Sequence, residues 1–169
     1  MADLKETRTE LNLLEAFAGE AQANRRYLAF ASKAEQEGHM QVAKLFRAAA
    51  AAETIHALAH LRVVGGVGET ADNLRNAIAG ETHEFTAMYP EMIAVAAEEN
   101  IAMAERSFEL ANTVEKIHAE LYQQALAKLG NNPEVDYYVC KVCGNTLEGA
   151  PGGACEICGA GVNAFQLIE

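Results

Sequence analysis

Glu53-Thr54-Ile55-His56 and Glu115-Lys116-Ile117-His118 are two matching stretches of this chain. In each stretch a Glu and a His lie three residues apart, and on a helix this spacing places both side chains on one face, about one turn apart. A Glu-x-x-His from each of two helices, with a Glu from each of two others, is the ligand set of a carboxylate-bridged dimetal site in a four-helix bundle. The two stretches therefore predict a mainly α-helical protein built around a pair of metal ions.

The spacing of apolar residues predicts four helices, over about 4–35, 39–64, 70 onward and 100–129. Gly38 is expected to end the first helix, Thr70 to cap the third, and Pro90 to kink the third. All four helices carry carboxylates or imidazoles on their apolar stripes, namely Glu20, Glu53, His56, Glu81, Glu84, Glu115 and His118. Ionisable groups on the buried side of a helix need a partner, and divalent cations would supply one.

The chain also contains an internal repeat. Gly19-Glu20 recurs as Gly80-Glu81, 61 positions later, and Glu53-x-Ile-His56 recurs as Glu115-x-Ile-His118, 62 positions later. Two helical hairpins related by pseudo-two-fold symmetry would place two equivalent ligand sets face to face. Glu53 and Glu115 are then placed to bridge two metals, while each half adds a terminal Glu and a His.

Glu84 departs from this symmetry, because its counterpart in the first half is Ala23. An extra inward carboxylate suggests a site whose coordination changes during its cycle, although a solvated or hydrogen-bonded Glu84 is the alternative. Carboxylate and imidazole ligands with open positions suit iron or manganese, and two such metals can pass two electrons together to oxygen or peroxide. Tyr27 and Tyr89 follow Glu20 and Glu81 by seven and eight residues, either as core residues or as donors to a ligand carboxylate.

All four cysteines lie near the C-terminus, as Cys140-Lys-Val-Cys143-Gly144 and Cys155-Glu-Ile-Cys158-Gly159. Two such pairs predict a tetrahedral four-thiolate metal site, with a glycine after each pair to allow a tight turn. Zinc would make this module structural, whereas iron would make it a one-electron carrier, and its fusion to a redox dimetal site favours iron. The predicted domains are a bundle over 1–130, a linker over 131–135 and a metal module over 136–169.

Composition excludes several classes of function. The net charge of −11 argues against a nucleic-acid surface. No apolar run reaches the roughly 20 residues of a membrane span, and the N-terminus lacks the pattern of an export signal. Metal-binding thiols also fit a reducing compartment. The expected location is therefore the cytoplasm, with neither membrane nor nucleic acid as a partner.

Together these features resemble the rubrerythrin family over essentially the whole chain. That family joins a ferritin-like di-iron four-helix bundle to a small C-terminal rubredoxin-like domain. The resemblance implies that Glu53 and Glu115 bridge two irons and that Glu20, Glu81 and His118 are terminal ligands. It also implies that one iron shifts between Glu84 and His56 with oxidation state, and that Tyr27 and Tyr89 lie near the two irons. A third iron is implied on Cys140, Cys143, Cys155 and Cys158. Glu156 departs from the family's Cys-Pro-x-Cys-Gly pattern and adds negative charge beside that iron.

The resemblance implies a peroxidase that protects against oxidative stress by reducing hydrogen peroxide to water, with Glu84, His56, Tyr27 and Tyr89 as catalytic residues. Electrons would come through the rubredoxin-like iron from a donor protein such as rubredoxin or its reductase, fed by NAD(P)H. A ferroxidase or iron-handling protein and a non-enzymatic peroxide sensor are the alternatives. Zinc remains a possible substitute for iron.

The linker predicts that the cysteine module lies beyond the end of the last helix. From Glu115 to Leu129 that helix spans roughly 20 Å, so electron delivery within one chain is expected to be slow. A head-to-tail homodimer, or a larger homo-oligomer, would bring the module of one chain beside the bundle of another.

Overall fold

The computed structural model describes residues 4–169, and contacts group the chain into two units, residues 1–68 and 69–169. The elements are α1 Arg8–Gln36, α2 Met40–Val63, α3 Thr70–His83, the π-helical segment η1 Glu84–Met88, α4 Tyr89–Glu98, α5 Ala102–Ala127, β1 Tyr137–Cys140, β2 Thr146–Glu148, the 3₁₀ turn η2 Val162–Ala164 and β3 Phe165–Ile168. The predicted helices are therefore confirmed to within a few residues. The expected lack of an export signal rests partly on residues 1–3, which lie outside the described residues.

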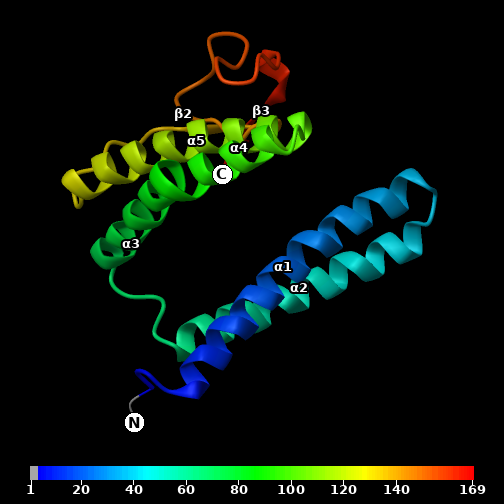
Figure 1. Ribbon diagram of the computed structural model, residues 1–169, viewed down its shortest axis with the longest axis vertical. Helices are drawn as coiled ribbons and strands as arrows, with labels where there is room; N and C mark the ends of the chain where they lie inside the picture. Colours follow the sequence, from blue (N-terminus) through cyan, green and yellow to red (C-terminus); the bar gives the residue numbers. More distant parts are fainter. Residues whose placement is uncertain (1–3) are drawn as a thin grey trace. The chain divides into compact units, whose positions relative to one another are not determined.

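The first unit is a hairpin in which α1 and α2 lie side by side and antiparallel (Figure 1). Gly38 ends α1 with a φ of +82°, a conformation that glycine adopts without strain, as the sequence predicts. The buried residues of α2 are Ala43, Ala50 and Ala57, spaced by seven. Side chains this small allow the two helix backbones to approach closely.

Asn24 ties the two helices of the hairpin together. Its Nδ2 donates to the carbonyl oxygen of Ala50 at 2.7 Å and to Oγ1 of Thr54 at 2.9 Å. Large apolar side chains nevertheless remain at the surface of this unit, since Leu45 and Ile55 are each 68% exposed. The hairpin by itself thus buries small residues and leaves a broad apolar surface.

In the second unit, α3, η1 and α4 pack on α5. Glu69, and not Thr70 as predicted, is the N-cap of α3, so Thr70 is its first residue. Pro90 lies at the start of α4 and follows the π-helical turn. The predicted kink thus takes the form of a local change in helix type, because the first turn of a helix accommodates a proline without a lost hydrogen bond.

The π-helical turn explains why the two halves of the repeat differ in spacing. Glu20 and Glu81 are 61 residues apart, whereas Tyr27 and Tyr89 are 62 apart. One extra residue therefore lies between Glu81 and Tyr89, where the structure has the segment Glu84–Met88. A π turn accommodates one added residue in a helix, so the residues on either side keep positions equivalent to those of the first half.

A three-stranded antiparallel sheet in the order β2-β1-β3 forms the C-terminal module. Tyr138 of β1 is paired with Leu147 of β2 and with Leu167 of β3. The first cysteine pair begins at the end of β1, since Cys140 is the last residue of that strand. The sheet thus fixes one end of the four-cysteine cluster.

The module folds back against α5 of the same unit, which contradicts the predicted placement beyond the end of that helix. Nε2 of His118 lies 2.9 Å from Oγ1 of Thr146 in β2. The chain reverses just after α5, where Gly130 has a φ of +88° and Nδ2 of Asn132 donates to the carbonyl oxygen of Ala125 at 3.0 Å. The length of the helix from Glu115 to its end therefore does not measure the distance between the second unit's carboxylates and the cysteine module.

No helix among residues 4–169 combines the length and the apolar character that spanning a membrane requires.

Candidate metal sites

Four thiols converge in the C-terminal module. The Sγ atoms of Cys140 and Cys158 are 3.7 Å apart, and those of Cys143 and Cys155 are 3.6 Å apart. A tetrahedral metal with bonds of about 2.3 Å to sulfur requires sulfur–sulfur separations of roughly 3.8 Å. The donor set therefore fits one tetrahedral ion, and each close pair joins one Cys-x-x-Cys stretch to the other.

The two Cys-x-x-Cys stretches have the same backbone geometry. The N–H of Gly144 donates to the carbonyl oxygen of Cys140, and the N–H of Gly159 donates to that of Cys155, both at 2.8 Å. Gly144 and Gly159 have φ values of +84° and +78°. The tight glycine turns expected from the sequence are therefore confirmed.

The surroundings of these thiols change their acidity in opposite directions. Burial raises the pKa of Cys143 to about 12. Burial also raises that of Cys155, but the backbone amides of Cys158 and Ile157 and the side chain of Asn145 outweigh it and lower the pKa of Cys155 to about 6. The pocket thus already stabilises a thiolate at Cys155, and thiolate is the form that binds metal.

The first unit carries a cluster of Glu20, Glu53 and His56, whose candidate ligand atoms all lie within 4.8 Å of one another. Glu20 comes from α1, while Glu53 and His56 lie one turn apart on α2. Nδ1 of His56 is 3.0 Å from Oε2 of Glu53 and 3.9 Å from Oε1 of Glu20. The hairpin alone therefore gathers the two carboxylates and one imidazole of one half of the repeat.

The second unit carries the equivalent cluster of Glu81, Glu115 and His118, again within 4.8 Å. Nδ1 of His118 is 2.7 Å from Oε2 of Glu115 and 3.9 Å from Oε1 of Glu81. The His118 side chain is 26% exposed, whereas that of His56 is 55% exposed. The same residue types thus occupy the same relative positions in both halves, with the second cluster more enclosed.

The second cluster cannot hold all its negative charge without compensation. Burial, followed by the nearby charge of Glu115, raises the pKa of Glu81 to about 7. Carboxylates crowded in this way either share a proton or bind a cation. The cluster therefore fits a divalent metal on the chemistry of its donors.

Glu84 lies outside the 4.8 Å cluster of the second unit but close to it. Burial raises its pKa, and the charge of Glu115 raises it as well. Burial and then the charges of Glu115 and Glu84 likewise raise the pKa of Tyr89. Both residues therefore lie near the second carboxylate cluster, Glu84 as the first residue of the π-helical turn and Tyr89 as the residue after that turn.

Tyr27 has different surroundings from Tyr89. Its ring packs against Phe30 and Phe46, with centroids 6.3 and 6.2 Å away. Tyr89 has one such aromatic neighbour, Phe108, at 6.3 Å. The two tyrosines occupy equivalent places in the repeat, but they differ in their aromatic neighbours, and burial together with nearby carboxylate charges raises the pKa of Tyr89.

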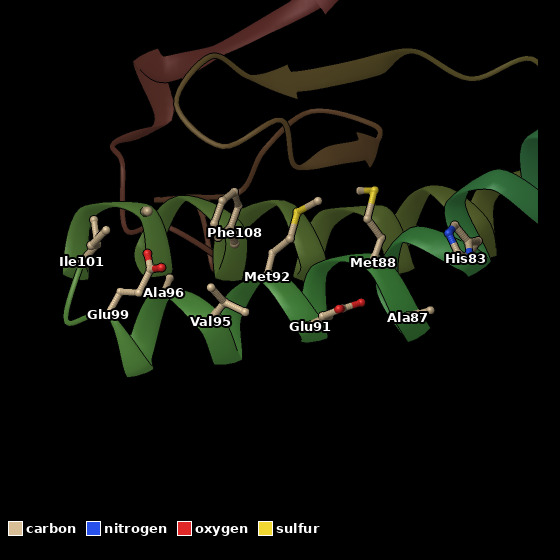
Figure 2. A pocket seen from close by; sticks show the side chains of 11 residues that line it. His83, Ala87, Met88, Glu91, Met92, Val95, Ala96, Glu99, Ile101 and Phe108 are labelled. Atoms are coloured by element: carbon tan, nitrogen blue, oxygen red, sulfur yellow. The ribbon is translucent and has the colours of Figure 1, made fainter.

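An open apolar groove of about 670 Å³ lies in the second unit, along η1, α4 and the start of α5 (Figure 2). Its lining includes His83, Met88, Met92 and Phe108. None of the predicted metal ligands lines it. The size of a groove alone therefore does not identify the metal sites of this chain.

Comparison with known proteins finds relatives over most of the chain. Residues 12–126 match the family model described as rubrerythrin. The chain belongs to the rubrerythrin family. It is 35% identical to rubrerythrin-2 of Clostridium acetobutylicum, covering 92% of this chain and 94% of that protein. It is 33% identical to nigerythrin of Nitratidesulfovibrio vulgaris, covering 87% of this chain and 80% of that protein.

Solved structures of nigerythrin resemble the fold. The structure described as the partially reduced state of nigerythrin superposes with a TM-score of 0.59 at 32% identity, covering 99% of this chain and 91% of that one. The fold class expected from the sequence is thus confirmed as a ferritin-like helical bundle with a small rubredoxin-like metal domain. The expected cofactors, two non-haem irons and one four-cysteine iron, are confirmed for the family and match the side-chain clusters.

Two residues near the metal clusters were not found from the sequence. Asn145 is 3% exposed and its Nδ2 lies 3.6 Å from Sγ of Cys155. Thr146 contacts His118 from the neighbouring strand. Both follow Gly144 in a stretch without periodicity, so only the way the module packs could identify them.

Proposed function

We propose that this chain is a non-haem di-iron peroxidase that reduces hydrogen peroxide to water. Rubrerythrins are generally di-iron proteins of oxidative stress, and homologues in the family are oxidoreductases. The observation that carries the proposal is the pair of equivalent Glu, Glu, His clusters, with Glu84 added in the second half only. An asymmetric ligand set suits a centre that changes coordination as it is oxidised and reduced.

In this proposal seven residues supply ligands for two irons: Glu20, Glu53, His56, Glu81, Glu84, Glu115 and His118. Glu53 and Glu115 would each contribute to both iron sites, and Glu84 and His56 would serve one iron in its two oxidation states. Two irons held together supply the two electrons that turn one hydrogen peroxide and two protons into two waters. Tyr89 lies near Glu81, Glu84 and Glu115, and burial and their charges raise its pKa, so its hydroxyl keeps a proton that it could donate in a hydrogen bond to a ligand carboxylate.

In this proposal the four cysteines would hold a third iron, and this iron site would accept electrons from outside the chain. A donor such as rubredoxin or its reductase, itself fed by NAD(P)H, would supply them. The acidic surface, with a net charge of −11, favours a donor with a basic docking face. We also propose a cytoplasmic location and a homodimer or larger homo-oligomer.

Anaerobic multiple turnover tests the function. The iron-loaded chain, with a chemical or protein reductant in excess, should consume many equivalents of hydrogen peroxide per chain. A single equivalent followed by arrest would indicate a peroxide sensor. Oxidation of added ferrous ion with retention of ferric ion would instead indicate a ferroxidase or iron-handling protein, the second candidate from the same carboxylates.

A further inference from the structure

A hydrogen-bonded chain connects the carboxylate cluster of the second unit with the four-cysteine module. Nε2 of His118 lies 2.9 Å from Oγ1 of Thr146, and Oγ1 of Thr146 donates to the carbonyl oxygen of Gly144 at 3.1 Å. Gly144 directly follows Cys143 of the cysteine cluster. The other ring nitrogen of His118, Nδ1, faces Glu115 at 2.7 Å. The imidazole therefore has one nitrogen toward the carboxylates and the other toward the module.

The protons along this chain can be assigned. A threonine hydroxyl has one proton to donate, and a backbone carbonyl can only accept. If the Thr146 hydroxyl donates to Gly144, it can only accept from His118, so Nε2 carries a hydrogen. In the metal-bound form the neutral imidazole has its one N–H at Nε2, and Nδ1 supplies its lone pair to the metal that it would share with Glu115. This is the arrangement in which Nδ1 can bind a metal while the hydroxyl and the carbonyl are both satisfied.

We propose that Thr146 is a positioning residue for His118, fixing the imidazole with Nε2–H toward the cysteine module and the Nδ1 lone pair toward the metal. The inference rests on the proposed role of His118 as a ligand. Partners of this kind orient ligating histidines, and their loss commonly weakens metal binding by 10- to 100-fold. Here the partner comes from the other metal module and not from the bundle.

The first half of the repeat provides a contrast. His56 is 55% exposed, and its contacts within the described residues are to Glu53 and Glu20, both from Nδ1. The imidazole of His56 therefore has no hydroxyl partner on Nε2 among residues 4–169, whereas that of His118 does. Thr146 thus restricts the orientation of the His118 ring, whereas the ring of His56 has no such restraint on Nε2.

Two measurements on the full-length chain test the proposal. In zinc-loaded protein labelled with ¹⁵N-histidine, the Nε2–H of His118 should give a slowly exchanging NMR signal, since it is hydrogen-bonded inside the protein. T146V, which keeps the shape but removes the hydroxyl, should lose that protection and bind zinc at the bundle about tenfold more weakly. T146S should restore both properties, because serine keeps the hydroxyl.

Control variants separate the possible failures. T113V removes an exposed hydroxyl on α5, the helix that carries His118; among residues 4–169 this hydroxyl bonds to the carbonyl oxygen of Glu109 alone, and its loss should change neither measurement. The visible band of the iron-loaded cysteine site should persist in T146V, showing that the module is intact. If H118N weakens zinc binding but T146V binds zinc as the wild type does and keeps a protected Nε2–H, the role of Thr146 is refuted. If H118N itself binds zinc normally, the ligand role of His118 in the proposed function fails.

Discussion

Glu81 makes the metal-free chain sensitive to pH. Burial, followed by the charge of Glu115, raises its pKa from 4.5 to about 7 in the folded chain. Between these values the unfolded chain releases a proton that the folded chain retains. The contribution of Glu81 to stability is therefore complete below pH 4.5 and is lost as the pH rises toward 7. A bound divalent cation should remove this dependence, because it replaces the proton.

Urea unfolding of metal-free protein at several pH values from 4.5 to 8 measures this effect. The free energy of unfolding of the wild type should fall relative to that of E81Q as the pH rises, since glutamine does not titrate. A constant difference between the two proteins across this range would mean that Glu81 keeps an ordinary pKa.

Glu84 distinguishes a redox centre from a passive metal store. Glu84→Ala should retain the iron of the bundle, because the other six proposed ligands are intact, but it should slow peroxide turnover by about tenfold or more. The measurement is iron content together with steady-state peroxide consumption. Glu91→Ala, an exposed carboxylate on α4, should leave both unchanged. Wild-type turnover in Glu84→Ala would refute the idea of an exchangeable ligand.

The identity of the cluster residues could be predicted from the sequence because helical spacing is local. Glu53 and His56 meet on one face whatever the rest of the chain does, and so do Glu115 and His118. The contacts of Asn145 and Thr146 could not be predicted in this way. The contact of Asn145 depends on how the cysteine module folds around Cys155, and that of Thr146 on how a strand packs on a helix 28 residues away in sequence; no periodicity encodes either.

Among the helices, the α1–α2 hairpin depends on close approach at small residues. Ala50 is 1% exposed, and its carbonyl oxygen also accepts from Asn24. Ala50→Leu should therefore force the helices apart and destabilise the chain by about 1–3 kcal/mol. Ala51→Leu, at the exposed neighbouring position, should change stability little. Thermal and urea unfolding of both variants compare them, and equal stabilities would contradict this description of the interface.

The π-helical turn shows what helix prediction from periodicity misses. A single proline correctly marked the irregular region, but a kink was predicted where the structure has a π segment followed by a new helix. The one-residue difference between the Glu20–Glu81 and Tyr27–Tyr89 spacings was already present in the sequence. It could be assigned to Glu84–Met88 only once the hydrogen bonding of the helix was known. The turn places Glu84, the asymmetric carboxylate, at its first residue.

Over the whole chain, the bundle and the cysteine module are expected to bind iron independently. Cys158→Ser should abolish the visible absorption of the four-cysteine iron and lower the iron content from about three to about two per chain, since one thiolate of a tetrahedral site is lost. The bundle irons should remain. Loss of all iron together would contradict two separable sites. The predicted boundaries of these domains, 1–130 and 136–169, stay a prediction.

The most direct test of the peroxidase proposal is metal analysis of the full chain combined with its visible spectrum through one cycle of reduction and peroxide addition. About three irons per chain are expected, from two bundle ligand sets and one four-thiolate site. The visible cysteine–iron band should bleach on anaerobic reduction and return within seconds of adding hydrogen peroxide, with peroxide consumed in proportion. One metal per chain, or a band that stays bleached while peroxide persists, would contradict the proposal.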